Sequence, residues 1–312
     1  MRRFLYVLAG LLLAYIGIGY WLSSLIVSPP PRRSVTESHQ RLLEGFGYDQ
    51  LALLDGLPQP HEVAFASSTP HLQLRGWWFK GSDTATCGLV MAHGITENRA
   101  NTLKYATVFS DCDCHMLLYD HRGHGQSDGQ LLTGGALESD DVLAAVRWLA
   151  DTTGLSPKQV GLVGESWGAS AVLLASAKTD QVAFALADSP YTSWRDAILQ
   201  RGVKQYGSVL HVFTPIAFAW VEWRTGVAME DAAPERLASR INTPTLLVHS
   251  QQDTITPPRH SEQIVANIKT GFGESRILDW GAWHAHNALA RPEAYRQMVS
   301  EFLERHQMPM CE

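Results

Sequence analysis

Short apolar runs alternate with longer amphipathic stretches from about residue 62 onward. The almost wholly apolar runs are residues 87–92, 115–119, 160–163, 182–187 and 245–249. Segments such as residues 136–149 lie between them and repeat their apolar positions at helical spacing. Nearly continuous apolar strands separated by helices predict a mostly parallel sheet covered by helices on both faces, hence an α/β fold. Residues 62–80 instead predict an antiparallel hairpin that precedes this alternation.

The N-terminal segment has a different pattern. Residues 4–27 contain no charged residue, and a helix of that length spans about 36 Å, enough to cross a hydrocarbon core of about 30 Å. Arg2 and Arg3 precede the run, and Tyr20 and Trp21 lie near its far end. The pattern predicts a single-pass transmembrane anchor, and a cleaved signal peptide is the alternative.

These patterns predict three parts of the chain. Residues 1–30 form the membrane anchor, residues 31–60 form a connecting arm, and residues 61–308 form the α/β domain. Residues of about 194–234 interrupt the alternation and predict a small helical cap. Basic residues flank the anchor almost equally on its two sides, with a slight preference for an exported catalytic domain at the membrane.

Composition limits the function classes. The 312 residues are 45% hydrophobic and 18% charged, which is typical of a globular protein rather than a disordered one. A net charge of −6 disfavours nucleic acid as a partner, because phosphate contacts require a basic surface. No set of cysteines and histidines has the spacing of metal ligands, so we expect no metal.

Residues 164–168 carry a Gly-x-Ser-x-Gly motif between the apolar run 160–163 and an Ala/Leu-rich helical segment. This setting is typical of a nucleophile elbow, a tight strand-to-helix turn that exposes a reactive serine. The motif predicts Ser166 as the nucleophile. It also places the backbone N–H of Trp167 at a helix N-terminus, where it can stabilise an oxyanion.

With this motif the chain resembles the α/β-hydrolase superfamily over roughly residues 60–308. Three further motifs of the family lie at residues 91–95, 119–129 and 246–253. Residues 93–101 are most similar to serine hydrolases that carry one N-terminal membrane helix. The resemblance implies an α/β-hydrolase fold, no cofactor, a structural role for His93, and the backbone N–H of Ile95 as the second oxyanion donor.

The resemblance also implies a general base and an acid that follow the serine in chain order. His284 and His286 compete as the base, and the small residues before His284 favour it. Asp253 is the preferred acid because it follows a strand, and Asp188 is the alternative at the end of an earlier strand.

Together these residues predict a serine hydrolase that cleaves a carboxylic ester or thioester through an acyl-enzyme. The expected cap holds several large aromatic residues, namely Phe213, Phe218, Trp220 and Trp223. They suit an apolar, lipid-like acyl substrate, although packing within the cap explains them equally well. The alternatives are a serine peptidase and a catalytically silent scaffold of the same fold.

The family order of strands would make Cys87 and Cys114 neighbours at one edge of the sheet. Parallel neighbours lie about 4.8 Å apart, within the range that a disulfide allows. A bridge between them, with Cys112 as a substitute partner, would indicate an oxidising compartment and an exported domain. Free, half-buried thiols are the alternative.

Overall fold

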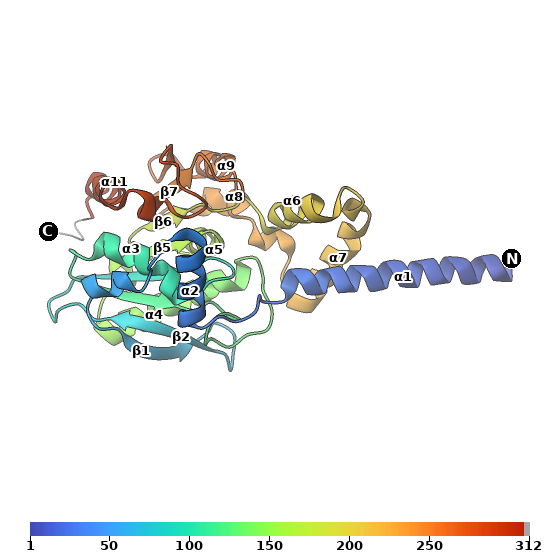
Figure 1. Cartoon of the computed structure of the whole chain (residues 1–312), viewed down its shortest axis with the longest axis horizontal. Coiled ribbons are helices and arrows are strands. Elements are labelled where there is room, and N and C mark those ends of the chain that lie inside the picture. Colours follow the sequence, from blue (N-terminus) through green and yellow to red (C-terminus); the bar gives the residue numbers. More distant parts are fainter. Residues whose placement is uncertain (309–312) are drawn as a thin grey trace.

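The structure, a computed structural model, describes residues 1–308 and contains one eight-stranded sheet in the order β1-β2-β4-β3-β5-β6-β7-β8 (Figure 1). The strands are β1 (His61–Ala66), β2 (Gln73–Phe79), β3 (Cys87–Ala92), β4 (Cys114–Tyr119), β5 (Val160–Glu165), β6 (Ala185–Asp188), β7 (Thr245–Ser250) and β8 (Gly273–Leu278). β1 and β2 form an antiparallel hairpin, β2 joins β4 antiparallel, and every later pairing is parallel. The α/β class and the leading hairpin are therefore confirmed.

Helices cover both faces of this sheet. The α-helices are α1 (Arg2–Val27), α2 (Val35–Phe46), α3 (Leu103–Ala106), α4 (Ala136–Thr153), α5 (Trp167–Ser176), α6 (Trp194–Tyr206), α7 (Leu210–Thr225), α8 (Pro234–Leu237), α9 (Arg259–Asn267), α10 (Asn287–Ala290) and α11 (Pro292–Arg305). Short 3₁₀ turns are η1 (Ala52–Gly56), η2 (Arg99–Thr102), η3 (Thr107–Phe109), η4 (Pro157–Gln159), η5 (Met229–Ala232) and η6 (Ala238–Arg240).

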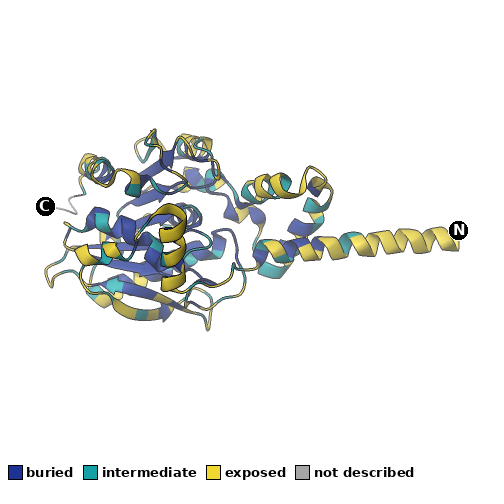
Figure 2. Ribbon diagram, in the orientation of Figure 1, coloured by how far each residue is buried: buried dark blue, intermediate teal, exposed yellow. Residues whose placement is uncertain are grey.

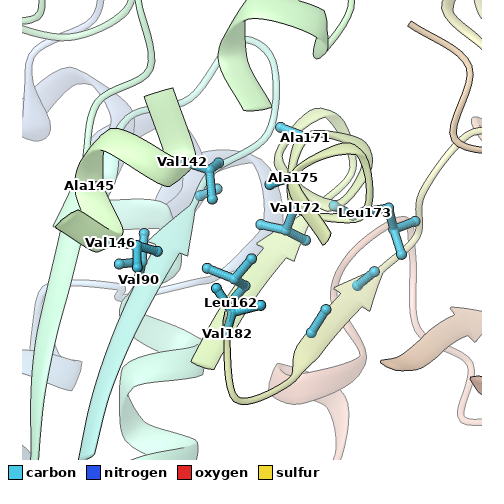
Figure 3. Close-up of a cluster of buried hydrophobic side chains, with 14 of the residues drawn as sticks. Val90, Val142, Ala145, Val146, Leu162, Ala171, Val172, Leu173, Ala175 and Val182 are labelled. Carbon is cyan, nitrogen blue, oxygen red and sulfur yellow. The ribbon is translucent and has the colours of Figure 1, made fainter. Parts of the chain in front are cut away.

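The continuous apolar runs are explained by burial on two sides. Alternate residues of a strand point to opposite faces, so Val90 joins the cluster under α4 and α5 while Leu89 joins the cluster under α3 and α11. Figure 3 shows the first cluster, in which Val90 and Leu162 of the sheet pack against Val142 of α4. All residues of β3, β4, β5 and β7 are buried.

One strand begins later than its apolar run. The sequence pattern predicts a strand over residues 182–187, but β6 begins only at Ala185. Val182 is buried in the same core cluster without entering the sheet ladder. Burial and strand pairing are different properties, and an apolar pattern reports only burial.

α6 and α7 form a helical hairpin that projects from the domain beside α1 (Figure 1). The outer part of α1 is exposed along its length, whereas its end near the domain is partly covered (Figure 2). Val27 is fully buried, and its carbonyl accepts a hydrogen bond from the Leu132 amide at 2.8 Å. The end of α1 therefore packs against the α/β domain and the α6–α7 hairpin, although the sequence pattern predicts a boundary between them at residue 30.

A disulfide joins Cys87 and Cys114, which are paired in register at the start of β3 and β4 with Cα atoms 4.8 Å apart. The bridge expected from the strand order is confirmed, and none of the described cysteines is free. The disulfide links β3 directly to β4. Along the chain, these two strands are connected through η2, α3 and η3.

Replacing both bridged residues, Cys87→Ser with Cys114→Ser, should lower the free energy of unfolding by about 3–4 kcal/mol. The bridge closes a loop of sequence separation 27 and thereby restricts the unfolded chain. Urea unfolding of the oxidised wild type, the reduced wild type and the double variant measures this. Equal midpoints for the three samples would contradict the prediction.

Candidate active site

Ser166 occupies the turn between β5 and α5 with φ 50° and ψ −111°, a backbone conformation that residues other than glycine rarely adopt. Such a conformation costs about 1–3 kcal/mol and persists only where its surroundings enforce it. Here the Ser166 amide donates to the Asp188 carbonyl at 2.8 Å, and the Ser166 carbonyl accepts from the Ser170 amide at 3.1 Å. Both ends of the turn are therefore held by the sheet and the helix.

The two glycines of the motif are required by close backbone approach. A Cβ on Gly164 would lie 2.4 Å from the Gly168 carbonyl oxygen, and one on Gly168 would lie 2.1 Å from the Ala92 carbonyl oxygen. Any side chain at either position would push α5 away from β5 or β3. The backbone around Ser166 is therefore as crowded as expected for a nucleophile elbow.

The side chains of Ser166, His284 and Asp253 are brought together from three separate loops. His284 Nε2 lies 2.8 Å from Ser166 Oγ, and His284 Nδ1 lies 2.6 Å from Asp253 Oδ2. A carboxylate can only accept, so Nδ1–H donates to Asp253 and Nε2 is left to accept from the Ser166 hydroxyl. This arrangement can withdraw a proton from the serine.

Asp253 lies just beyond β7 and is held as an anion. Its Oδ1 accepts hydrogen bonds from the backbone amides of Ile255 at 2.9 Å and Thr256 at 3.0 Å. Burial by itself raises the pKa of Asp253, but hydrogen bonds from His249 and His284 outweigh it and bring the pKa well below its ordinary value. The carboxylate is therefore charged at neutral pH.

The alternative acid and base lie elsewhere in the site region. Asp188 binds the hydroxyl groups of Ser189 at 2.9 Å and Tyr295 at 3.2 Å, and burial raises its pKa. His286 stacks on Tyr48 with ring centroids 5.7 Å apart, and burial lowers its pKa to about 3. The structure brings His284 rather than His286 to Ser166, and it brings Asp253 rather than Asp188 to His284.

Two backbone amides beside Ser166 are available to a ligand. The Trp167 amide is the first of α5 and so lacks a partner one turn earlier in its helix. Within residues 1–308, neither this amide nor that of Ile95 donates a hydrogen bond to another group of the chain. Both have the unpaired character that an oxyanion donor requires.

The loop that carries Ile95 is fixed by a buried histidine. His93 Nδ1 donates to the Gly94 carbonyl at 2.7 Å, while His93 Nε2 accepts from the His121 amide at 3.0 Å. Burial and the neighbouring His121 and His124 lower the pKa of His93, so its ring is neutral. It holds the loop after β3 against the loop after β4, which agrees with the structural role expected for it.

A buried ion pair lies behind the site, and sequence reasoning missed it. Lys104 pairs with Glu165, both side chains being almost fully buried, and Lys104 Nζ also donates to the Ala285 carbonyl at 2.8 Å. Glu165 Oε1 accepts from the Gly94 amide at 3.1 Å. The pair thus joins the turn at Ser166, the loop before Ile95 and the loop of His284. The signal in the sequence was Glu165, a carboxylate that ends an otherwise apolar strand.

The segment expected as a connecting arm lies against two of the site loops. Ser38 Oγ donates to Glu97 Oε2 at 2.8 Å, and Arg41 forms an ion pair with the same carboxylate. At the other end of α2, the ring of Phe46 stacks on Trp283 with centroids 5.0 Å apart. Residues before the α/β domain therefore support the loop of Ile95 and the loop of His284.

Two family models match successive parts of the chain. A model described as X-Pro dipeptidyl-peptidase (S15 family) matches residues 94–213, and a model described as TAP-like protein matches residues 221–312. The uncharacterized protein YqkD of Bacillus subtilis is 29% identical over 310 residues, which cover 97% of this chain and 98% of YqkD.

Solved structures share the fold. The esterase Pf2001 of Pyrococcus furiosus matches with a TM-score of 0.66 and 21% identity over 89% of this chain and 98% of its own. The α/β hydrolase GrgF of a Penicillium species matches with a TM-score of 0.62 and 22% identity over 80% of this chain and 99% of its own. The strand order and the strained serine turn define an α/β hydrolase. The chain has the α/β-hydrolase fold, and the two family models, which together match most of its length, agree with the resemblance that its motifs indicated.

Replacing Lys104 by Met should lower the free energy of unfolding by about 3–5 kcal/mol, because Glu165 would remain as an unpaired buried charge. Adding Glu165→Gln should restore part of this loss. Lys80→Met is the matched control, since Lys80 pairs with Asp83 at the surface and should matter by less than about 1 kcal/mol. Urea unfolding measures all three variants, and equal losses for Lys104→Met and Lys80→Met would refute the prediction.

Proposed function

We propose that the protein is a serine hydrolase that cleaves carboxylic esters or thioesters through an acyl-enzyme. The observation that carries the proposal is the continuous hydrogen-bonded chain from Ser166 through His284 to Asp253, at 2.8 and 2.6 Å. Ser166 is the nucleophile, His284 the general base, and Asp253 the acid that orients the imidazole. The serine also lies on the strained turn that such a nucleophile requires.

In the first step, Ser166 Oγ attacks the substrate carbonyl while its proton passes to His284 Nε2. The imidazolium that forms is stabilised by the Asp253 carboxylate, whose low pKa keeps it charged. The carbonyl oxygen becomes an oxyanion that accepts hydrogen bonds from the amides of Ile95 and Trp167, at the N-terminus of α5. The oxyanion then collapses, the bond from the acyl carbon to the leaving oxygen or sulfur breaks, and His284 gives its proton to that atom so that an alcohol or thiol departs.

In the second step, water takes the place of the leaving group. His284 removes a proton from the water, whose oxygen attacks the acyl carbon. The second oxyanion collapses, the bond to Ser166 Oγ breaks, and the serine regains its proton from His284. The reaction releases a carboxylic acid, and these side chains and the two backbone amides are the protein groups that it uses.

An apolar acyl group fits the surroundings of the two oxyanion donors. Trp167 belongs to a buried cluster with Phe218 and Val221 of α7, and half-buried Ile95 packs against it. The aromatic residues of the cap differ in burial, since Phe218 is buried whereas Trp223 is largely exposed. The buried part supports an apolar wall beside the site.

A serine peptidase is the second candidate, and the S15 family model over residues 94–213 favours it. The two activities share the acyl-enzyme and differ in the leaving group. Paired ester and amide substrates with the same acyl part separate them. A catalytically silent scaffold is the third candidate, and the complete set of Ser166, His284 and Asp253 speaks against it.

The proposed hydrolase is held at a membrane by α1, the helix of the described chain that is long and apolar enough to cross a bilayer. A signal sequence would have the same composition. The packing of Val27 inside the domain favours a retained helix, because cleavage after it would remove a fully buried residue from the cluster around Trp167. The Cys87–Cys114 bridge supports a domain on the exported side.

Ser166→Ala should lower the turnover of a short acyl ester by about four to six powers of ten while leaving the fold intact, because alanine fills the same space without a nucleophile. His284→Ala should be similarly inactive. His286→Ala, the matched control two residues further along the same loop, should keep activity within about tenfold of wild type, since its ring packs on Phe46, Tyr48 and Trp283 and not on Ser166.

Steady-state kinetics on a graded series of acyl esters, with circular dichroism as the check on folding, measures these effects. Turnover by Ser166→Ala near the wild-type rate would refute the nucleophile. Loss of activity in His286→Ala alone would transfer the role of base to His286.

A further inference from the structure

α1 is free of the remainder of the protein only over its first half. Residues 2–14 are all exposed, and Tyr15 is the first residue that packs against the domain, with its hydroxyl donating to the Val212 carbonyl at 3.0 Å. The free part is therefore about 20 Å long, whereas the hydrocarbon core of a bilayer is about 30 Å thick. If α1 crosses the bilayer, residues 15–21 must also lie within the hydrocarbon core to span its remaining thickness.

α7 runs alongside this second half of α1 in the same direction. Phe213 lies beside Tyr15, with ring centroids 5.7 Å apart, and further along Arg224 donates to Ser24 Oγ at 2.8 Å. Between these points, Gly19 is buried so closely under Ile216 that a Cβ on it would lie 2.5 Å from Ile216 Cγ2. α7 cannot leave α1 without breaking this packing. The beginning of α7 is thus at the depth of Tyr15.

A belt of aromatic residues marks one level along the paired helices. Tyr20 of α1 lies edge-on to Trp220 of α7 at 5.3 Å, and Trp220 contacts Trp223 at 5.2 Å. Trp21 and Trp223 expose 55% and 73% of their surface. Exposed tryptophan and tyrosine at one level are typical of the boundary between acyl chains and headgroups. From this level to Tyr15 the helix rises by about 8 Å toward its N-terminus.

We infer that the tip of the α6–α7 hairpin, residues 206–212, inserts into the same bilayer that α1 crosses and makes the cap a second membrane-binding element. The inference rests on the anchor put forward with the proposed function. Val209 and Val212 at the tip expose 62% and 59% of their surface, which lipid would cover. Arg201 and Lys204 on α6 are exposed just above the tip. Their long stems let both charges reach headgroup phosphates.

The hairpin connects this membrane surface to the site. At the base of α6, Trp194 packs edge-on against Trp167 with ring centroids 6.0 Å apart. Trp167 follows the nucleophile and carries one of the two oxyanion amides. The substrate class that fits is therefore an ester whose acyl chain comes from the lipid leaflet, in preference to a freely dissolved one.

Depth-dependent fluorescence quenching tests the inference on the full-length chain in phosphatidylcholine and phosphatidylglycerol vesicles. Cys311 lies outside the described residues and is replaced by Ser in every variant, and none of the described cysteines is free, so a new cysteine can carry an environment-sensitive fluorophore. Val209→Cys reports the hairpin tip, Leu12→Cys reports the free part of α1, and Thr152→Cys at an exposed position of α4 is the control. None of these positions belongs to the site, so turnover of a short ester checks the fold of each variant.

Lipids brominated on their acyl chains should quench the labels at Val209→Cys and Leu12→Cys at least about twofold and leave the Thr152→Cys label unchanged. Quenching at Leu12→Cys with none at Val209→Cys would overturn the insertion of the hairpin and leave the anchor standing. Absence of quenching at both positions would overturn the anchor together with the insertion. Short-ester turnover reports the hydrolase proposal separately in every case.

Discussion

The strained backbone of Ser166 is the constraint on which the site depends. A residue with a side chain holds φ 50° only because β5, α5 and β3 are packed without space between them. Gly168 shows how tight this is, since even one additional carbon would collide with the Ala92 carbonyl. The fully apolar strands, buried on both faces, provide the rigid support that enforces the turn.

The loops around this turn are held together by hydrogen bonds between buried polar groups rather than by apolar packing. The Lys104–Glu165 pair reaches the loop of Ile95 through the Gly94 amide and the loop of His284 through the Ala285 carbonyl. Ser189 Oγ accepts a hydrogen bond from the Ala285 amide at 3.2 Å, which adds a second tie to that loop. Buried charges of this kind do not add stability easily, but their directional bonds favour one arrangement of the loops.

The N-terminal part of the chain belongs to this assembly. α2 supports the loop of Ile95 through Glu97, and the buried end of α1 packs with the cap. Two elements from the N-terminal end of the chain, α2 and the buried end of α1, therefore pack around the site. A membrane-bound hydrolase of this form would present its cap, rather than its sheet, to the lipid.

Local sequence patterns were enough to predict the parallel sheet, the hairpin of β1 and β2, and Ser166 on its turn. The pairing of Cys87 with Cys114 and the preference for His284 and Asp253 came from the resemblance to the family, each with an alternative left open. The sheet follows from continuous apolar runs between helical segments, and the turn follows from glycine on both sides of the serine. Lys104 could not be found in this way, because its partners Glu165 and Ala285 are distant in sequence and no local pattern links them. The packing of Gly19 under Ile216 was hidden for the same reason.

The predicted start of β6 was wrong for a different reason. Val182 is as apolar as the residues of the strand and is buried with them, but the ladder begins at Ala185. Only the geometry of the neighbouring strands decides where hydrogen bonding starts, and that information is not local.

Under the proposed function, the fold makes one serine, Ser166, reactive. Labelling of the native full-length protein with a fluorophosphonate, followed by mass spectrometry of its peptides, tests this directly. We expect one label per chain on the peptide that contains Ser166. We expect no label when the protein is unfolded in acid before the reagent is added, because the reactivity requires the turn and His284. A label on another residue of the native protein, or equal labelling of the unfolded chain, would contradict it.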